Sequence, residues 1–127
     1  MIYGVGTDVV EIARIEKALS RWGERFAERI LCSPELNRFR NHRQPASYLA
    51  KRFAAKEAFT KALGTGIHAP ANWHGVWVVN LKSGKPQLEF SAALARLLED
   101  RGIRRSHLTL TDERDMAAAT VILECDG

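Results

Sequence analysis

The spacing of apolar residues changes along the chain, and these changes predict its secondary structure. Residues 2–10 are rich in β-branched and aromatic types and predict a first strand. Gly4 and Gly6 within it indicate a bulge or the close approach of another backbone. The apolar positions that follow recur every three or four residues: Ile12, Ile15, Leu19, Trp22 and Phe26. This spacing predicts one amphipathic helix.

Two more helices are predicted before the middle of the chain. The pair Ser33-Pro34 is typical of an N-cap followed by the first helical position, and it opens a short helix that reaches Arg43. Pro45 is expected to end this helix. Apolar spacing then predicts a third helix over about residues 46–63, which Gly64 stops.

The second half of the chain has the signals of antiparallel strands. The runs GVWVVNL and KPQLEF are joined by KSGK, which predicts a hairpin. Ser91 can cap a helix that stops at Gly102, and the runs SHLTLT and MAAATVILE predict two last strands around the turn DERD. Hairpins and helices segregated in this way predict an α+β fold with helices packed on an antiparallel sheet, in a single domain over residues 1–127.

Composition narrows the class of protein. Apolar residues make up 46% and charged residues 27% of the 127 positions, as in globular proteins. The net charge of +4 favours an acidic partner: nucleic acid, an acidic protein or a phosphorylated small molecule. No signal peptide or membrane span is visible. Two distant cysteines, Cys32 and Cys125, without metal-type spacing favour the reducing cytoplasm.

Two acids are candidate ligands for a hard cation. Asp8 lies near the end of the first predicted strand, where it can either bind a metal or cap the next helix. Glu57 shares a helix face with Phe53 and precedes Lys61 by four residues. Taken alone, Glu57 and Lys61 are an ordinary surface ion pair.

The segment after Glu57 changes this interpretation. Backbone N–H groups of the Gly64-Thr65-Gly66 loop can approach a phosphate, and the nearby Arg52, Lys56 and Lys61 offer cations to phosphate oxygens. The loop alone is more simply a helix end and turn, and it is not a Walker P-loop. Together with the two acids, it predicts Mg²⁺ held on a pyrophosphate. The basic run RFRNHR at 38–43 is either a second phosphate site or a solvated loop.

Three arginines form a possible docking surface on the first predicted helix. At about 100° per residue they fall in one narrow sector, from which most acids are absent. They are Arg14, Arg21 and Arg25. This arginine column is either a solvated face or a site for an acidic helix or a nucleic-acid backbone. A nucleic-acid-binding domain would bind without a divalent ion, and a non-catalytic module for acidic helices would need no pair of acids.

Several of these segments resemble those of the bacterial holo-[acyl-carrier-protein] synthases, the small 4′-phosphopantetheinyl transferases. The resemblance lies in GTDVVEIARI, RFAAKEAFTKALGTGI, GKP and the final HLTL and AAATVILE, and it covers nearly the whole chain. It implies transfer of 4′-phosphopantetheine from coenzyme A to a serine of apo-acyl carrier protein, releasing adenosine 3′,5′-bisphosphate in support of fatty acid biosynthesis. It also implies the family's fold, a cytoplasmic homotrimer with sites between subunits, and no nucleic-acid or membrane partner.

The resemblance further implies residue roles. Asp8 and Glu57 match Mg²⁺ ligands and, with Lys61, the catalytic residues. The positions that match the coenzyme A site are Arg43, Arg52, Lys61, Gly64, Thr65, Gly66, Lys85, Pro86 and His107. Arg43 falls near basic residues that reach the 3′-phosphate from a neighbouring subunit. The arginine column matches the helix that docks the carrier protein.

Some of these residues have simpler interpretations. Lys85-Pro86 alone indicates a turn, and His107 alone a structural histidine. Some relatives carry a second histidine where this chain has Asp112, so no role of that histidine applies here. The base that takes the serine proton therefore stays open between a Mg²⁺-bound water, Glu57 and another acid.

Overall fold

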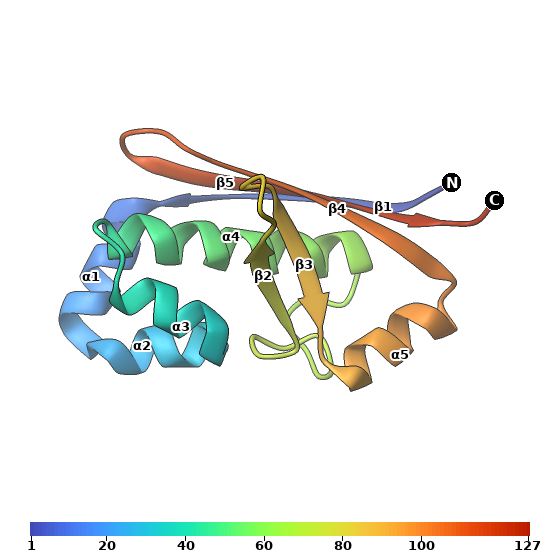
Figure 1. The fold of residues 1–127 in the computed structure, drawn as a ribbon, viewed down its shortest axis with the longest axis horizontal. Helices are drawn as coiled ribbons and strands as arrows, with labels where there is room; N and C mark the ends of the chain where they lie inside the picture. The colour runs from blue at the N-terminus through green and yellow to red at the C-terminus, as the bar shows by residue number, and fades with distance from the viewer.

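A three-stranded antiparallel sheet with a long helix on one face organises the molecule (Figure 1). The computed structural model describes residues 1–127. The strand order is β1-β5-β4, formed by β1 (Ile2–Glu11), β4 (Ile103–Asp112) and β5 (Met116–Cys125). The predicted first strand and last hairpin are confirmed, and so is the α+β class.

The long helix α4 (Pro45–Leu63) lies across the sheet and confirms the predicted third helix. Gly64 ends it in the left-handed conformation, with φ of 88°, as a glycine at this position allows. The expectation that Pro45 ends the preceding helix is wrong. Pro45 opens α4, because the first helical position needs no backbone N–H donor.

Two glycines allow β1 to approach α4 closely. A Cβ at Gly4 would lie 2.0 Å from the carbonyl oxygen of Ala62, and one at Gly6 would lie 1.9 Å from that of Ala58. Only glycine leaves room for this contact, so the predicted close backbone approach is confirmed. Side chains alternate across a strand, so Asp8 faces α4 as these glycines do.

The first predicted helix is two helices. Gly23, with φ of 65°, separates α1 (Ile12–Trp22) from α2 (Glu24–Ile30), so four helices, not three, precede the hairpin. The apolar spacing runs on across the break because Phe26 of α2 also packs against the core.

The next helix is shorter than predicted. α3 (Ser33–Arg40) is capped by Cys32, not Ser33, and it ends before Arg43. Arg43 therefore lies in the loop that leads to α4.

The predicted hairpin and fourth helix are confirmed. β2 (Val76–Asn80) pairs with β3 (Pro86–Phe90) in a separate two-stranded sheet. Helix α5 (Ala92–Asp100) follows, and the hydroxyl oxygen of Ser91 caps it by accepting the N–H of Leu94 at 3.2 Å. No helix of the chain is long and apolar enough to cross a membrane.

One face of the three-stranded sheet is uncovered. All five helices lie on its other side (Figure 1). The side chains that point away from α4 include several exposed apolar ones: Tyr3 (38% exposed), Val5 (56%), Val9 (57%) and Met116 (36%). We call this surface the open sheet face. It is more apolar than a sheet face in contact with water usually is.

Candidate active site

Asp8 and Glu57 meet where β1 crosses α4. Asp8 is two residues beyond Gly6 on β1, and Glu57 precedes Ala58, the residue that Gly6 contacts on α4. Partial burial and then the negative charge of Asp8 raise the pKa of Glu57 above its ordinary value, although the nearby Lys61 charge opposes this. The acid pair predicted as a cation site is therefore brought together. The capping alternative is wrong, because α1 is preceded by Glu11 and has no side-chain cap.

Lys61 belongs to this site but binds a different partner than predicted. Its Nζ donates to Asp8 Oδ1 at 3.0 Å and to the carbonyl oxygen of Thr7 at 3.0 Å. The ion pair thus joins α4 to β1, in place of the expected pair with Glu57. Lys61 keeps 52% of its side chain exposed, so its ammonium group is also open to an anion in solvent.

The glycine loop directly follows these residues. The N–H groups of Gly64 and Thr65 both donate to the carbonyl oxygen of Thr60, at 2.8 and 3.2 Å, which closes the helix. The interpretation as a helix end is therefore confirmed. Gly64 and Gly66 are exposed, and both have positive φ. Phosphate binding by this loop stays a prediction.

Two of the three cations expected around Glu57 point elsewhere. Arg52 and Lys56 are 4% and 0% exposed, and they face α3 and β2. Arg52 lies five residues before Glu57, about 140° away around the helix axis. The expectation that Arg52 and Lys56 surround the acid pair is wrong, because α4 buries these positions under other elements.

Arg52 belongs to a second basic cluster on the other side of α4. Its guanidinium lies over the ring of Tyr48, 4.1 Å from the ring centre, and donates to Asn80 Oδ1 at 3.0 Å. Arg38 donates to the same oxygen at 2.8 Å. No carboxylate pairs with either guanidinium, and Arg52 Nε has no hydrogen-bond partner. Burial lowers the pKa of Arg52, because the charged guanidinium loses solvation there. A bound anion would offset this cost.

Asn80 also brings the predicted Lys85-Pro86 pair to this cluster. Asn80 is opposite Pro86 in the β2–β3 ladder, and its Nδ2 donates to the carbonyl oxygen of Gly84 at 3.0 Å. We call Arg38, Arg52 and Asn80 the arginine cradle. Lys85 closes the turn by accepting the N–H of Leu81 at 2.9 Å, whereas Pro86 is the first residue of β3, so the turn interpretation holds for Lys85 only. Arg38 was visible in the basic run at 38–43, whereas Asn80 gave no signal because a strand-end asparagine is common.

His107 is not near the acid pair within one chain. It lies on β4 opposite Ile122, which is in turn opposite Val5, so its side chain is on the open sheet face. Its Nε2 bonds Glu124 Oε1 at 2.5 Å, and this bond is the main cause of the lowered pKa of Glu124.

Asp112 has a structural contact. It accepts the hydroxyl of Ser47 at 2.9 Å and pairs with Lys51 at 3.4 Å. These bonds join the end of β4 to the first turns of α4.

The arginine column is exposed but is not one helix face. Arg14 and Arg21 lie on α1, whereas Arg25 lies on α2 beyond the break at Gly23. The predicted alignment of all three on one helix is therefore wrong. Next to them, Trp22 is 59% exposed and stacks against the guanidinium of Arg21, 4.9 Å from the ring centre.

The fold and site define an α+β domain with an acid pair, a lysine and a glycine loop at one sheet edge, typical of metal-assisted phosphate chemistry. The chain belongs to the 4′-phosphopantetheinyl transferase superfamily, whose family model matches residues 4–121. The family resemblance predicted from the sequence is therefore confirmed.

Individual relatives cover nearly the whole chain. The holo-[acyl-carrier-protein] synthase of Nitrosomonas europaea is 50% identical over 124 residues, which are 98% of this chain and 99% of that protein. The crystal structure of holo-[acyl-carrier-protein] synthase from Neisseria meningitidis matches with a TM-score of 0.95 and 44% identity, over 98% of this chain and 99% of that one. The holo-(acyl-carrier-protein) synthase of Bacillus anthracis, solved in complex with CoA (3′,5′-ADP), matches with a TM-score of 0.84 and 36% identity, over 99% of each chain.

Proposed function

We propose that the chain transfers 4′-phosphopantetheine from coenzyme A to a serine hydroxyl of apo-acyl carrier protein, giving holo-carrier protein and adenosine 3′,5′-bisphosphate. The observation that carries this proposal is the convergence of Asp8, Glu57 and Lys61 beside the glycine loop, in a chain whose relatives are named for this reaction. The Bacillus anthracis relative with CoA (3′,5′-ADP) supports the donor.

Asp8 and Glu57 fit a Mg²⁺ ion. Mg²⁺ usually takes one or two carboxylates from the protein and its other ligands from phosphates and water. The Asp8 charge that raises the pKa of Glu57 is a repulsion that a divalent cation would relieve. When bound, Mg²⁺ neutralises phosphate charge and polarises a phosphoryl oxygen. Lys61, held by Asp8 and exposed, would bind the same phosphates.

The chain's own groups also orient and deprotonate the acceptor. Glu57 is one candidate for the group that takes the proton from the serine hydroxyl, although a Mg²⁺ ion bound to it would oppose its raised pKa. A Mg²⁺-bound water and other acids remain alternatives for this step.

The arginine cradle suits the nucleotide end of coenzyme A. Guanidinium groups bind phosphate through forked, charge-assisted hydrogen bonds, and Arg38 and Arg52 have no carboxylate partner here. Lys85 and Pro86 adjoin Asn80 and complete this side. Arg43, exposed in the loop after α3, would reach the 3′-phosphate of a coenzyme A bound to a neighbouring subunit.

A homotrimer would assemble these parts into complete sites. The acid pair and the arginine cradle lie on different sides of α4, and His107 lies on the open sheet face, so one chain does not bring them together. Burying the exposed apolar residues of that face against neighbouring copies is favourable by about 25 cal/mol per Å². The neighbouring chain would then supply His107 beside the acid pair and Arg43 to the 3′-phosphate.

The remaining assignments follow from the same proposal. Arg14, Arg21 and Arg25 would dock an acidic helix of the carrier protein, since all three are exposed on α1 and α2. The whole chain would act as a single transferase domain in the cytoplasm, where its two cysteines stay free, and would serve fatty acid biosynthesis.

Intact-mass spectrometry of the carrier protein tests the proposal. The protein is incubated with coenzyme A, Mg²⁺ and apo-acyl carrier protein, with a sample lacking coenzyme A as control. A mass gain of one 4′-phosphopantetheine group is expected only in the complete mixture. Binding without this gain would instead indicate a non-catalytic module, and salt-sensitive binding to DNA or RNA would indicate a nucleic-acid-binding domain.

A further inference from the structure

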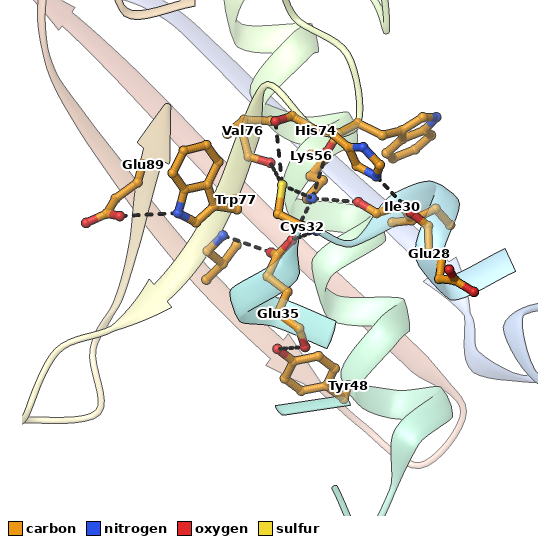
Figure 2. Close-up of polar contacts among 12 residues, drawn as sticks. Glu28, Ile30, Cys32, Glu35, Tyr48, Lys56, His74, Val76, Trp77 and Glu89 are labelled. Atoms are coloured by element: carbon orange, nitrogen blue, oxygen red, sulfur yellow. Dashed lines mark hydrogen bonds and ion pairs between the residues drawn. The ribbon is translucent and has the colours of Figure 1, made fainter. Parts of the chain in front are cut away.

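The centre of the molecule contains an ion pair that the proposed chemistry does not use. Lys56 Nζ, on α4, donates to Glu35 Oε1 at 2.7 Å and to the carbonyl oxygens of Ile30 and Trp73 at 2.6 and 2.8 Å (Figure 2). Lys56 and Glu35 are 0% and 1% exposed. An ammonium group has three donors, so Lys56 is fully satisfied without a substrate.

Glu35 extends the same network to two backbone N–H groups. Its Oε1 also accepts the N–H of Cys32 at 2.9 Å (Figure 2). Its Oε2 accepts the N–H of Val78 at 2.9 Å. Val78 is in the middle of β2, so a side chain of α3 takes the place of a strand partner there. The pair therefore ties three elements together: α3 through Glu35, α4 through Lys56 and β2 through Val78.

The same three elements make the arginine cradle. Arg38 follows Glu35 by three residues on α3, so it lies one helical turn away. Arg52 precedes Lys56 by four residues on α4, again one turn away. The third member of the cradle, Asn80, follows Val78 by two residues on β2. The molecule thus has a buried layer and an outer layer that share one scaffold.

We propose that Glu35 and Lys56 are positioning residues: by fixing α3, α4 and β2 against one another, they make Arg38 and Arg52 converge on Asn80 and so set how tightly the chain holds the 3′-phosphate of coenzyme A. The inference rests on the proposed function. An apolar pair of the same volume can stabilise a core as well as an ion pair does. An apolar pair would not, however, accept the N–H of Val78, so this hydrogen bond between α3 and β2 would be lost.

Glu35→Gln tests this bond selectively. Glutamine keeps one acceptor oxygen for Lys56 and Cys32, but it places an amide N–H₂ against the N–H of Val78. The measurement is the ratio of KM for 3′-dephospho-coenzyme A to KM for coenzyme A, with carrier protein saturating. A phosphate held by charge-assisted hydrogen bonds gives a wild-type ratio of about ten or more. In Glu35→Gln the ratio should fall to within about threefold of one, with kcat for coenzyme A changed less than about threefold.

Glu89→Gln is the matched control. Glu89 lies on β3 of the same hairpin and accepts only the indole N–H of Trp77, at 3.2 Å on the surface. It should keep the wild-type ratio. If Glu35→Gln does not fold, Glu35→Gln combined with Lys56→Met, which removes the unpaired buried charge, is measured in its place.

A double-mutant cycle with Asn80→Ala separates positioning from a general loss of stability. If the pair acts through the arginine cradle, Glu35→Gln adds little once Asn80 is gone, so the two effects on the ratio are not multiplicative. A folded Glu35→Gln protein with the wild-type ratio, or effects that multiply, overturns the inference. A wild-type protein that transfers nothing from either donor would instead overturn the proposed function.

Discussion

Asp8 Oδ1 and Lys61 Nζ lie 3.0 Å apart across the contact between β1 and α4. This ion pair places the ammonium group beside the acid that faces Glu57, while half of the lysine side chain stays exposed. One lysine is therefore positioned both to hold Asp8 and to bind phosphate oxygens at the same edge of the sheet.

Lys61→Ala should weaken the use of coenzyme A more than the use of carrier protein. Loss of one charged phosphate contact should raise KM for coenzyme A by about tenfold or more, with KM for carrier protein nearly unchanged. Lys51→Ala is the control, because Lys51 lies on the same helix but pairs with Asp112. Equal changes in both KM values, or none, would contradict a phosphate role for Lys61.

Glu57→Gln should stabilise the metal-free protein near neutral pH. Because burial and Asp8 raise the pKa of Glu57, its ionisation opposes folding at every pH above the ordinary glutamate pKa of about 4.3. The resulting loss in the free energy of unfolding is absent below about pH 4. It grows as pH rises from the ordinary to the raised pKa of Glu57 and is constant above it. The variant should therefore melt at a higher temperature than wild type at pH 7 to 8 in EDTA, and this advantage should vanish in acid.

Mg²⁺ provides the second arm of that measurement. A ligand that binds only the folded protein raises its melting temperature, so Mg²⁺ should stabilise wild type and leave Glu57→Gln nearly unchanged. Equal melting curves for the two proteins in EDTA at pH 7 to 8, or equal responses to Mg²⁺, would contradict the described environment of Glu57.

Gly6→Ala should disrupt the crossing of β1 and α4 that brings the two acids together. Its Cβ would lie 1.9 Å from the Ala58 carbonyl oxygen, so one backbone must move. We expect a loss of about 3 kcal/mol in the free energy of unfolding, measured by urea denaturation. Gly23→Ala is the control, because Gly23 has open space around it and only its positive φ is strained. A larger loss at Gly23 than at Gly6 would show that the close approach is not what stabilises this crossing.

The strands, the hairpins and α4 were predictable because their signals are local: alternation, turn residues and a glycine stop. The break at Gly23 was not, because apolar spacing continues from Trp22 to Phe26 across it. The orientations of Arg52 and Lys56 were also missed. α4 buries 13 of its 19 residues, so its helix pattern does not single out one polar face.

The acid pair with its glycine loop was predictable from local signals, whereas the arginine cradle was not. Asp8, Glu57 and the glycine loop lie in two continuous segments that carry their own pattern. The arginine cradle joins Arg38, Arg52 and Asn80 from three elements, and no local signal connects Asn80 with Arg38 across 42 positions of the chain.

Reversing Arg14 and Arg21 to Glu should weaken encounter with an acidic carrier protein. Both residues are exposed on α1, so folding should be spared. Long-range attraction is screened by salt, so wild-type kcat/KM for carrier protein should fall as ionic strength rises, with coenzyme A saturating. The double variant should start about tenfold lower, as for other steered encounters, and respond less to salt.

The matched control reverses two arginines away from this surface. Arg96 on α5 and Arg104 on β4 are exposed, and neither lies on α1 or α2. Their double reversal gives the same change in net charge. If both double variants lower kcat/KM and its salt slope equally, only net charge matters and the arginine column is not a docking surface.

The central claim is that Asp8 and Glu57 support transfer of 4′-phosphopantetheine, and single-turnover transfer to apo-acyl carrier protein tests it most directly. Wild type, Asp8→Ala and Glu57→Ala are compared with coenzyme A over a Mg²⁺ titration, and circular dichroism confirms that each is folded. Groups that stabilise developing charge are worth about 100-fold or more in rate. We therefore expect wild type to convert the carrier in a Mg²⁺-dependent way and both folded variants to be slower by at least about that factor. A folded variant that keeps the wild-type rate and Mg²⁺ dependence would contradict the account.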